Sequence, residues 1–208
     1  MFRLPQSTEV KRPLPKAQLY KKFELKQSQR DAVDADIARL DFVNMIAPQT
    51  MPAIAEGTDV KAVFVVEVEL KRPDYDKKSI ALVAKLIPQQ IIFALRYGEK
   101  MQLAAYHTKL FVGQWQPSDA VTIPLAGLNL DAVWQNMVAA IGEMEVADGN
   151  TLTEQIQADD ERTRLLKRIE TLERQMRSTA QKHRQRELYA EIKKLKQSIN
   201  GETENAKP

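Results

Sequence analysis

Residues 63–71, which read Val-Phe-Val-Val-Glu-Val-Glu-Leu-Lys, constrain the fold of this chain more than any other segment. Successive side chains on a β-strand point to opposite faces of the sheet. A strand here therefore places Phe64, Val66, Val68 and Leu70 on one face, and Glu67, Glu69 and Lys71 on the other. The first face needs a cover of other elements, whereas the second concentrates two carboxylates and an ammonium group.

The neighbouring segments predict an α+β fold, with a small mixed sheet and packed helices. Helical spacing of apolar residues predicts a helix over 29–45, and a second over about 80–87 that stops before Pro88. The β-rich runs 90–97 and 101–107 predict a β-hairpin, which a strand over 110–115 follows. A further helix is expected to run from Asn129 to about residue 141.

Beyond residue 149 the sequence becomes charged and helix-favouring. Its apolar residues form two seams that are out of phase, with a capping-box pattern at residues 178–181 between them. This predicts an antiparallel, coiled-coil-like helical hairpin over about 153–177 and 181–199, whose seams are a candidate interface for a partner or a homodimer. The seam residues are Leu165, Ile169, Leu172, Met176, Leu188, Ile192, Leu195 and Ile199.

The expected organisation has four parts, because composition changes at three points along the chain. A flexible basic arm is expected at 1–13, the α+β domain at 14–148, the charged helical hairpin at 149–200, and a disordered tail at 201–208.

Composition excludes several classes of chemistry. The chain has no Cys and only two His, so thiolate metal sites, disulfides and Cys nucleophiles are excluded and zinc chemistry is not expected. No apolar run approaches the roughly 20 residues that span a bilayer, and no secretory leader is recognisable at the start. We therefore expect a cytoplasmic protein with no membrane partner.

The net charge of +3 is unevenly distributed. Residues 1–30 carry eight Lys or Arg against two Glu, and residues 161–197 carry twelve against five, so the remainder is acidic. Basic ends are compatible with contacts to nucleic-acid phosphates, although a solvated coiled coil has the same composition. The candidate DNA-binding residues are Arg184, Arg186, Lys193, Lys194 and Lys196.

A series of short motifs runs through nearly the whole chain in a characteristic order. Among them are Val66-Glu67-Val68-Glu69-Leu70-Lys71, Tyr97-Gly98-Glu99-Lys100-Met101-Gln102-Leu103 and Leu128-Asn129-Leu130-Asp131-Ala132-Val133-Trp134. In this order they resemble the uncharacterised bacterial domain-of-unknown-function family 4391. The resemblance implies an accessory subunit encoded beside helicases and DNA methyltransferases in restriction-like or phage-defence islands. It supplies no catalytic residues.

The polar face of the 63–71 strand also allows a nuclease hypothesis. A Glu-x-Lys pair such as Glu69 and Lys71, with Glu67 beside it, is the arrangement in which carboxylates hold Mg²⁺ and a lysine supports the attacking water. A charged stripe paired with Arg96, Lys100 or Arg72 on neighbouring strands is the alternative. No convincing acidic residue ends a preceding strand, which weighs against the nuclease.

Other motifs for catalysis are missing from the sequence. It contains neither a phosphate-binding loop of the Gly-x-x-x-x-Gly-Lys type nor a Gly-x-Gly-x-x-Gly fingerprint, and it has no Ser-centred nucleophile motif. We therefore expect a non-enzymatic accessory or adaptor subunit without a cofactor. The alternatives are a Mg²⁺-dependent nuclease and a structural dimerisation protein.

Overall fold

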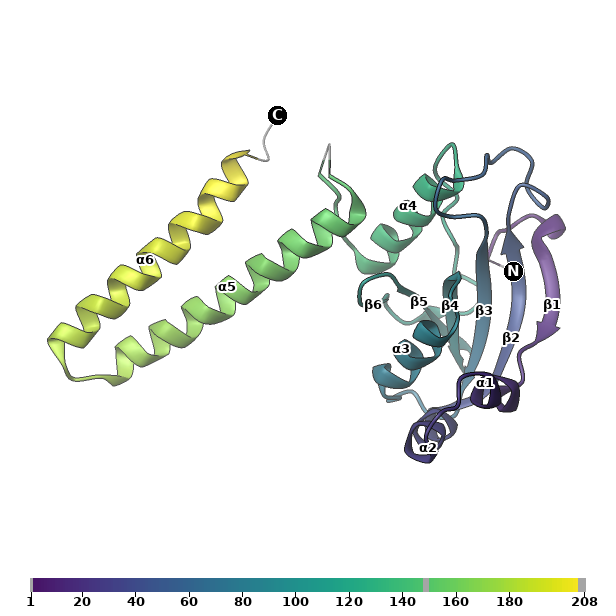
Figure 1. Cartoon of the computed structure of the whole chain (residues 1–208), viewed down its shortest axis with the longest axis horizontal. Helices are drawn as coiled ribbons and strands as arrows, with labels where there is room; N and C mark the ends of the chain where they lie inside the picture. The colour runs from purple at the N-terminus through teal and green to yellow at the C-terminus, as the bar shows by residue number, and fades with distance from the viewer. Residues whose placement is uncertain (1, 148–149, 206–208) are drawn as a thin grey trace. The chain divides into compact units, whose positions relative to one another are not determined.

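The computed structural model describes residues 2–147 and 150–205 of the 208-residue chain (Figure 1). The chain divides into two compact units, Met1–Glu145 and Val146–Pro208. The first contains a β-sheet with helices, and the second contains two long helices. The α+β class predicted from the sequence is confirmed.

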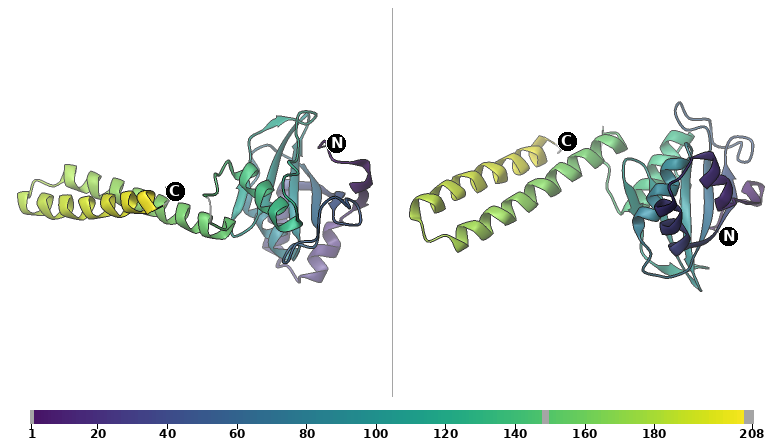
Figure 2. Two further views of the ribbon diagram at one scale, coloured as in Figure 1. Left: turned by 90° about the horizontal axis from the view of Figure 1, so that it is seen from above. Right: turned by 60° about the horizontal axis from the view of Figure 1, so that its bottom comes forward.

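One seven-stranded sheet forms the centre of the first unit (Figure 2). Its strands are β1 (Glu9–Pro13), β2 (Ile37–Ile46), β3 (Val63–Leu70), β4 (Gln90–Tyr97), β5 (Lys100–Tyr106), β6 (Leu110–Val112) and β7 (Gln116–Pro117). The order is β1-β2-β3-β4-β5-β6, and β7 pairs with β5. Only β3 and β4 are parallel, because helix α3 (Lys77–Leu86) crosses over between them. The predicted strand at 63–71 and the predicted β4–β5 hairpin are confirmed.

Three helices cover the apolar face of β3. Helices α1 (Lys16–Lys22), α2 (Gln27–Asp36) and α3 contribute Leu19, Val33 and Ile80 to one buried core with Val66 and Val68. The Asp76 side chain caps α3 by accepting a hydrogen bond from the backbone N–H of Lys78, at 2.9 Å.

Helix α4 (Leu130–Gly142) packs near β5 and β6 on the other face of the sheet. A Cβ atom at Gly142 would lie 2.8 Å from the Phe111 ring, so only glycine allows this approach. Along β3 on this face, Val63 and Val65 are fully buried, whereas Glu69 is exposed. The apolar cover therefore ends before the strand does, and the polar end of β3 stays open.

The prediction of a helix over 29–45 is wrong for residues 37–45, which form a strand. Helix α2 ends at Asp36 and the chain continues directly as β2. The register of β2 against β3 shifts between Ile37 and Arg39 and again between Phe42 and Asn44. These bulges bury residues 37, 40 and 44, a spacing that imitates a helix. The sequence pattern was therefore misread because the strand lacks strict alternation.

The start of the chain forms part of the sheet instead of a separate flexible arm. A single 3-10 turn, η1 (Gln6–Thr8), leads into β1, which pairs with β2. The buried Thr8 hydroxyl accepts a hydrogen bond from Asn44 at 2.8 Å, and Phe2 is only 3% exposed. These contacts are long-range, so local composition did not reveal them.

Asp131, in the first turn of α4, holds the loop that precedes β3. Its carboxylate accepts hydrogen bonds from the backbone N–H groups of Val60 (2.8 Å), Thr58 (2.6 Å) and Asp59 (3.2 Å). These bonds hold the pKa of Asp131 below its usual range. A Cβ at Gly57 would lie 2.4 Å from the same carboxylate, so the loop requires glycine there.

We expect Asp131→Ala to lower the free energy of unfolding by about 1–2 kcal/mol, because three backbone donors lose their acceptor at a partly solvated site. Asp119→Ala, which removes an exposed carboxylate, is the matched control and should change stability by less than about 0.5 kcal/mol. Urea unfolding followed by circular dichroism measures both. Equal midpoints for the two variants would contradict the proposed role of Asp131.

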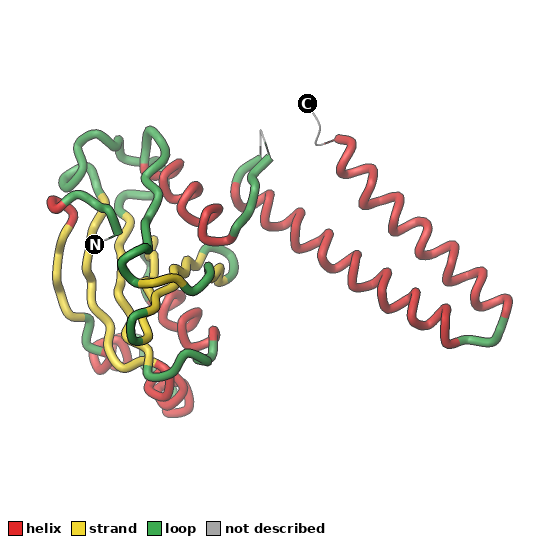
Figure 3. Tube along the Cα trace, turned by 180° about the vertical axis from the view of Figure 1, so that it is seen from behind, coloured by secondary structure: helices red, strands yellow, loops and turns green. Residues whose placement is uncertain are grey.

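The second unit is the predicted helical hairpin (Figure 3). Helices α5 (Leu152–Ser178) and α6 (Lys182–Asn205) run antiparallel and pack together through an apolar core. Thr151 and Glu154 form a reciprocal capping box at the start of α5. The hairpin predicted from the two out-of-phase seams is confirmed.

The ends of the hairpin helices differ from the expectation. Ser178 is the last residue of α5 and Thr179 is its C-cap, so the predicted capping box at 178–181 does not form. Helix α6 continues through residue 205 into the segment expected to be a disordered tail, and residues 206–208 lie outside the described part of the chain.

Candidate functional site

Charged side chains line a groove of about 270 Å³ over strands β1 to β4. We call it the charged groove, and its residues are Lys11, Pro13, Arg39, Asp41, Val43, Glu67, Glu69 and Arg96. It lies toward the carboxyl ends of the parallel strands β3 and β4, where ligand sites of parallel sheets are usually found. The polar face of β3 predicted from the sequence therefore forms part of a real concavity.

Cross-strand register sets the order of charges in this groove. Arg39, Glu69 and Arg96 are partners across β2, β3 and β4, and Asp41 is the partner of Glu67 in the next row. Opposite charges thus alternate in the row Arg39–Glu69–Arg96, and such cross-strand pairs stabilise a sheet. Asp41 and Glu67, by contrast, are like charges directly opposite each other, an arrangement that is unfavourable unless each carboxylate has a cationic partner.

Two of the three carboxylates already have cationic partners. Arg39 Nε lies 2.6 Å from Asp41 Oδ2, and Arg96 Nε lies 2.9 Å from Glu67 Oε1 as an ion pair without hydrogen-bond alignment. The Glu67 side chain is only 15% exposed. Arg96 is one of the three partners expected for this stripe. Among the residues that the structure describes, Glu69 has no ion pair within 4.0 Å.

Lys71 does not join Glu69 in the groove. Strand β3 ends at Leu70, and the backbone N–H of Lys71 donates to the Asp36 carbonyl at 2.8 Å. Its ammonium group donates to the backbone carbonyl of Asp34 in the last turn of α2. The Glu-x-Lys pair on which the nuclease hypothesis depended is therefore separated, because the strand ends one residue too early.

A buried acidic residue that sequence reasoning missed lies beside this point. The Asp36 side chain is 1% exposed and pairs with Arg72, whose Nη2 lies 2.6 Å away. It also accepts hydrogen bonds from the Ser79 hydroxyl at 2.7 Å and the Asp76 backbone N–H at 3.1 Å. No local signal marked Asp36, because its partners lie 36 to 43 positions further along the chain.

The Asp36 network is structural. Burial alone would raise the pKa of Asp36, but the hydrogen bonds from Ser79, Arg72 and the backbone of Asp76 outweigh burial and hold the pKa below its usual range. Every partner belongs to the junction of α2, β3 and α3. Asp36 therefore connects α2, β3 and α3. Because Arg72 pairs with Asp36, it does not pair with Glu67 or Glu69 as the sequence had suggested.

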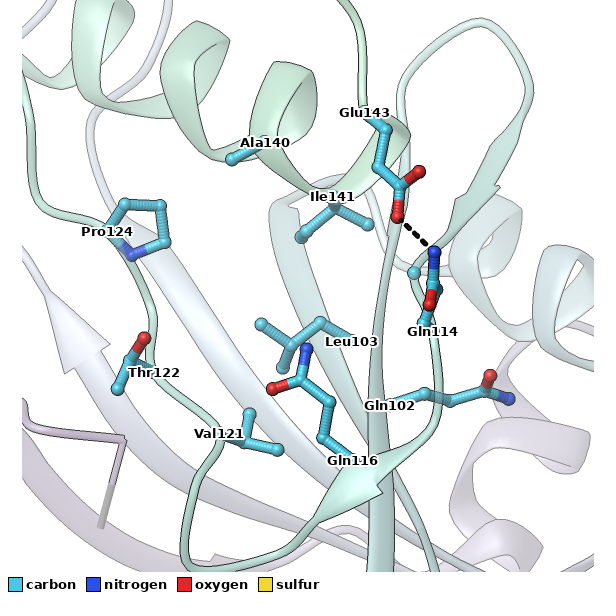
Figure 4. A pocket seen from close by; sticks show the side chains of 11 residues that line it. Gln102, Leu103, Gln114, Gln116, Val121, Thr122, Pro124, Ala140, Ile141 and Glu143 are labelled. Atoms are coloured by element: carbon cyan, nitrogen blue, oxygen red, sulfur yellow. Dashed lines mark hydrogen bonds between the residues drawn. The ribbon is translucent and has the colours of Figure 1, made fainter.

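A second concavity, between β5, the 113–124 segment and the end of α4, is almost uncharged (Figure 4). Its volume is about 130 Å³, which is below the 300–1,000 Å³ usual for small-molecule sites. Gln114 donates a hydrogen bond to Glu143 at 3.0 Å across its rim. Gln102, although it borders the cleft, donates its amide N–H to the Tyr75 hydroxyl at 2.7 Å. We assign no chemistry to this cleft.

The hairpin buries its apolar seam internally. Ile169, Leu172, Leu188, Ile192 and Ile199 form its core, and Leu165, Met176 and Leu195 pack against them. The eight seam residues considered as an interface are thus occupied by the partner helix of the same chain. A dimer through them would require the helices to exchange between chains.

The basic residues predicted to contact DNA differ in their surroundings. Lys196 pairs with Glu173 at 2.8 Å, and Arg184 pairs with Glu187 at 3.0 Å. Arg186, Lys193 and Lys194 are exposed and form no ion pair within the described residues. The structure therefore leaves three of the five predicted cations open to a ligand.

Within residues 2–147 and 150–205, no three His, Asp or Glu side chains are arranged to hold a metal ion. No helix in these ranges combines the length and the apolar character needed to cross a bilayer.

The fold and its charged surfaces define a class of protein: a mixed-sheet α+β domain joined to a separate basic helical hairpin. The family model described as Domain of unknown function (DUF4391) matches residues 2–199, so the chain belongs to this family. No curated protein and no solved structure matches the chain.

Proposed function

We propose that this protein is a non-enzymatic accessory subunit of a prokaryotic DNA-directed restriction or antiviral defence complex. It works in the cytoplasm beside a helicase, a DNA methyltransferase or both. The observation that carries the proposal is the hairpin, a compact unit that packs its apolar seam internally and presents a charged outer surface with an excess of Lys and Arg over residues 161–197. A charged surface of this kind is suited to binding partners of complementary charge.

The charged groove supports the non-enzymatic part of this proposal. Asp41 and Glu67 are neutralised by arginines, and the Lys71 ammonium group is held at the end of α2. Catalytic groups need to reach substrate or metal, and here most candidate groups already satisfy structural contacts. The kind of partner comes from the family resemblance, since helicases and methyltransferases are the expected neighbours.

Co-purification tests the proposal. The tagged full-length chain is expressed with the helicase and the DNA methyltransferase encoded beside it, and the complex is measured by size-exclusion chromatography with light scattering. We expect a stoichiometric complex with at least one of them. If neither enzyme elutes with the chain at micromolar concentrations, with or without DNA, the accessory role is wrong.

A Mg²⁺-dependent nuclease is a second candidate, because one observation favours it. Asp41, on β2, lies opposite Glu67 and near Glu69, so a third carboxylate joins the pair identified from the sequence. These carboxylates are the ligands that Mg²⁺ prefers. Arg39 and Arg96, however, lie where the ion would have to bind, so the residues as arranged do not fit a metal site.

A further inference from the structure

At the closed end of the hairpin, six residues line a groove of about 610 Å³, which we call the tip notch. They are Met176 and Arg177 from the last turn of α5, and Lys182, Gln185, Arg186 and Tyr189 from the first two turns of α6. The four α6 residues are spaced i, i+3, i+4 and i+7, so they share one face of that helix. The notch therefore combines three cations with an aromatic ring.

Cations in the notch lack the acidic partners that five cations elsewhere on the hairpin have. Lys193 and Lys194 also form no ion pair within the described residues, but they do not line the notch. Arg164, Arg168, Arg174, Arg184 and Lys196 each lie within 4.0 Å of a glutamate. Arg177, Lys182 and Arg186 have no such ion pair among the described residues, and no carboxylate lines the notch. Glu173, one turn before Arg177, is already bound to Lys196 at 2.8 Å.

This arrangement opposes the stability of the hairpin. Lys182 and Arg186 are like charges at i, i+4, which repel each other and destabilise the helix. Both lie near the positive end of the α6 dipole, where the first turn contains no acidic residue. An anionic ligand is the simplest explanation for cations at positions where they destabilise the helix.

Tyr189 indicates which anion fits. Tyr189 is 62% exposed and, within the described residues, forms no hydrogen bond, so its ring is accessible to solvent beside the cations. Cationic grooves with exposed aromatic rings bind single-stranded nucleic acid, because lysine and arginine contact phosphates while a base stacks on the ring. A duplex offers no unstacked base, and an acidic peptide offers no base at all.

We propose that the tip notch binds single-stranded DNA, with Arg177, Lys182 and Arg186 on phosphates and a base stacked on Tyr189. The choice of DNA over RNA rests on the proposed function, since a helicase partner produces single strands. The hairpin would then hold a displaced strand near the partner enzyme.

Fluorescence anisotropy with the purified full-length chain and labelled dT20 tests this proposal at low salt. The triple variant Arg177→Gln/Lys182→Gln/Arg186→Gln should weaken binding at least tenfold and reduce the salt slope by about 2, since each phosphate contact on a single strand contributes about 0.7. Tyr189→Ala should weaken binding at least about fivefold without changing the slope, whereas Tyr189→Phe should bind normally.

The matched control is Arg164→Gln/Arg168→Gln/Arg174→Gln, which removes the same charge from glutamate-paired positions and should change affinity less than threefold. Circular dichroism checks that all variants keep their helix content. Equal weakening by both triple variants, tighter binding to duplex DNA or to rU20 than to dT20, or equal competition by a poly-glutamate peptide would each overturn the proposal. Co-purification with the partner enzymes is measured as a separate experiment. If the complex forms but the chain does not bind dT20, the single-strand site in the tip notch is wrong and the accessory role still stands.

Discussion

Replacing Asp36 with alanine is expected to lower the free energy of unfolding by about 3 kcal/mol, although Asp36 lies outside every proposed binding surface. Removing one member of a buried ion pair leaves the other uncompensated, which typically costs 3–5 kcal/mol. The lower value applies because Arg72 is 48% exposed and can return to solvent, whereas Ser79 is buried. Guanidinium unfolding at pH 7 measures the loss. Asp74→Ala, an exposed neighbour, should cost less than about 0.5 kcal/mol.

The same network predicts a pH dependence with a defined sign. The pKa of Asp36 is lowered by folding, so its contribution to stability is present above the unfolded-state value of about 3.9 and is lost as pH falls through the folded value. Asp36→Asn should therefore cost stability at pH 7, and the difference from the original chain should shrink below about pH 4. A constant difference from pH 7 to pH 3 would show that Asp36 does not act through its charge.

Truncating the chain after Asp160 is expected to abolish partner binding and dT20 binding while leaving the first unit folded. The first unit is compact by itself and contains its own core. The truncation keeps Leu152 and Ile156, which are each 1% exposed, so no buried apolar side chain of the first turns of α5 is lost. Thermal unfolding of the truncated chain should remain a single cooperative transition. Absence of that transition would show that the hairpin is needed for folding.

Local patterns predicted the elements whose contacts lie close in sequence. The alternation in residues 63–70 gave β3 and its two faces, and the two out-of-phase seams gave the α5–α6 hairpin. In both cases the geometry of the strand or helix sets the spacing of its apolar residues, so the element can be predicted from the sequence of that segment alone.

Elements that depend on distant partners could not be predicted in the same way. Strand β2 contains two bulges, which remove the alternation, and β1 is a strand only because it pairs with β2. The polar site shows the same limit. Glu67 and Glu69 were found from the sequence, but Asp41 and Arg39 join them only through the β2–β3 register.

Lys71 shows how one residue can change a functional interpretation. Strict alternation places it beside Glu69, yet β3 ends at Leu70 and the lysine turns to the carbonyl of Asp34. The tip notch was missed for a different reason. Its cations belong to two helices, and their lack of glutamate partners becomes visible only when the pairs around them are known.

Phage restriction in living cells tests the central claim most directly, with the chain expressed together with its helicase and methyltransferase partners. If the protein is an accessory subunit, the Asp160 truncation should abolish protection, whereas Glu69→Gln should leave plating efficiency within about threefold of the original, because an exposed charge contributes less than about 1 kcal/mol. Loss of protection with Glu69→Gln, together with Mg²⁺-dependent DNA cleavage by the purified original chain that this variant lacks, would contradict the account and establish a nuclease.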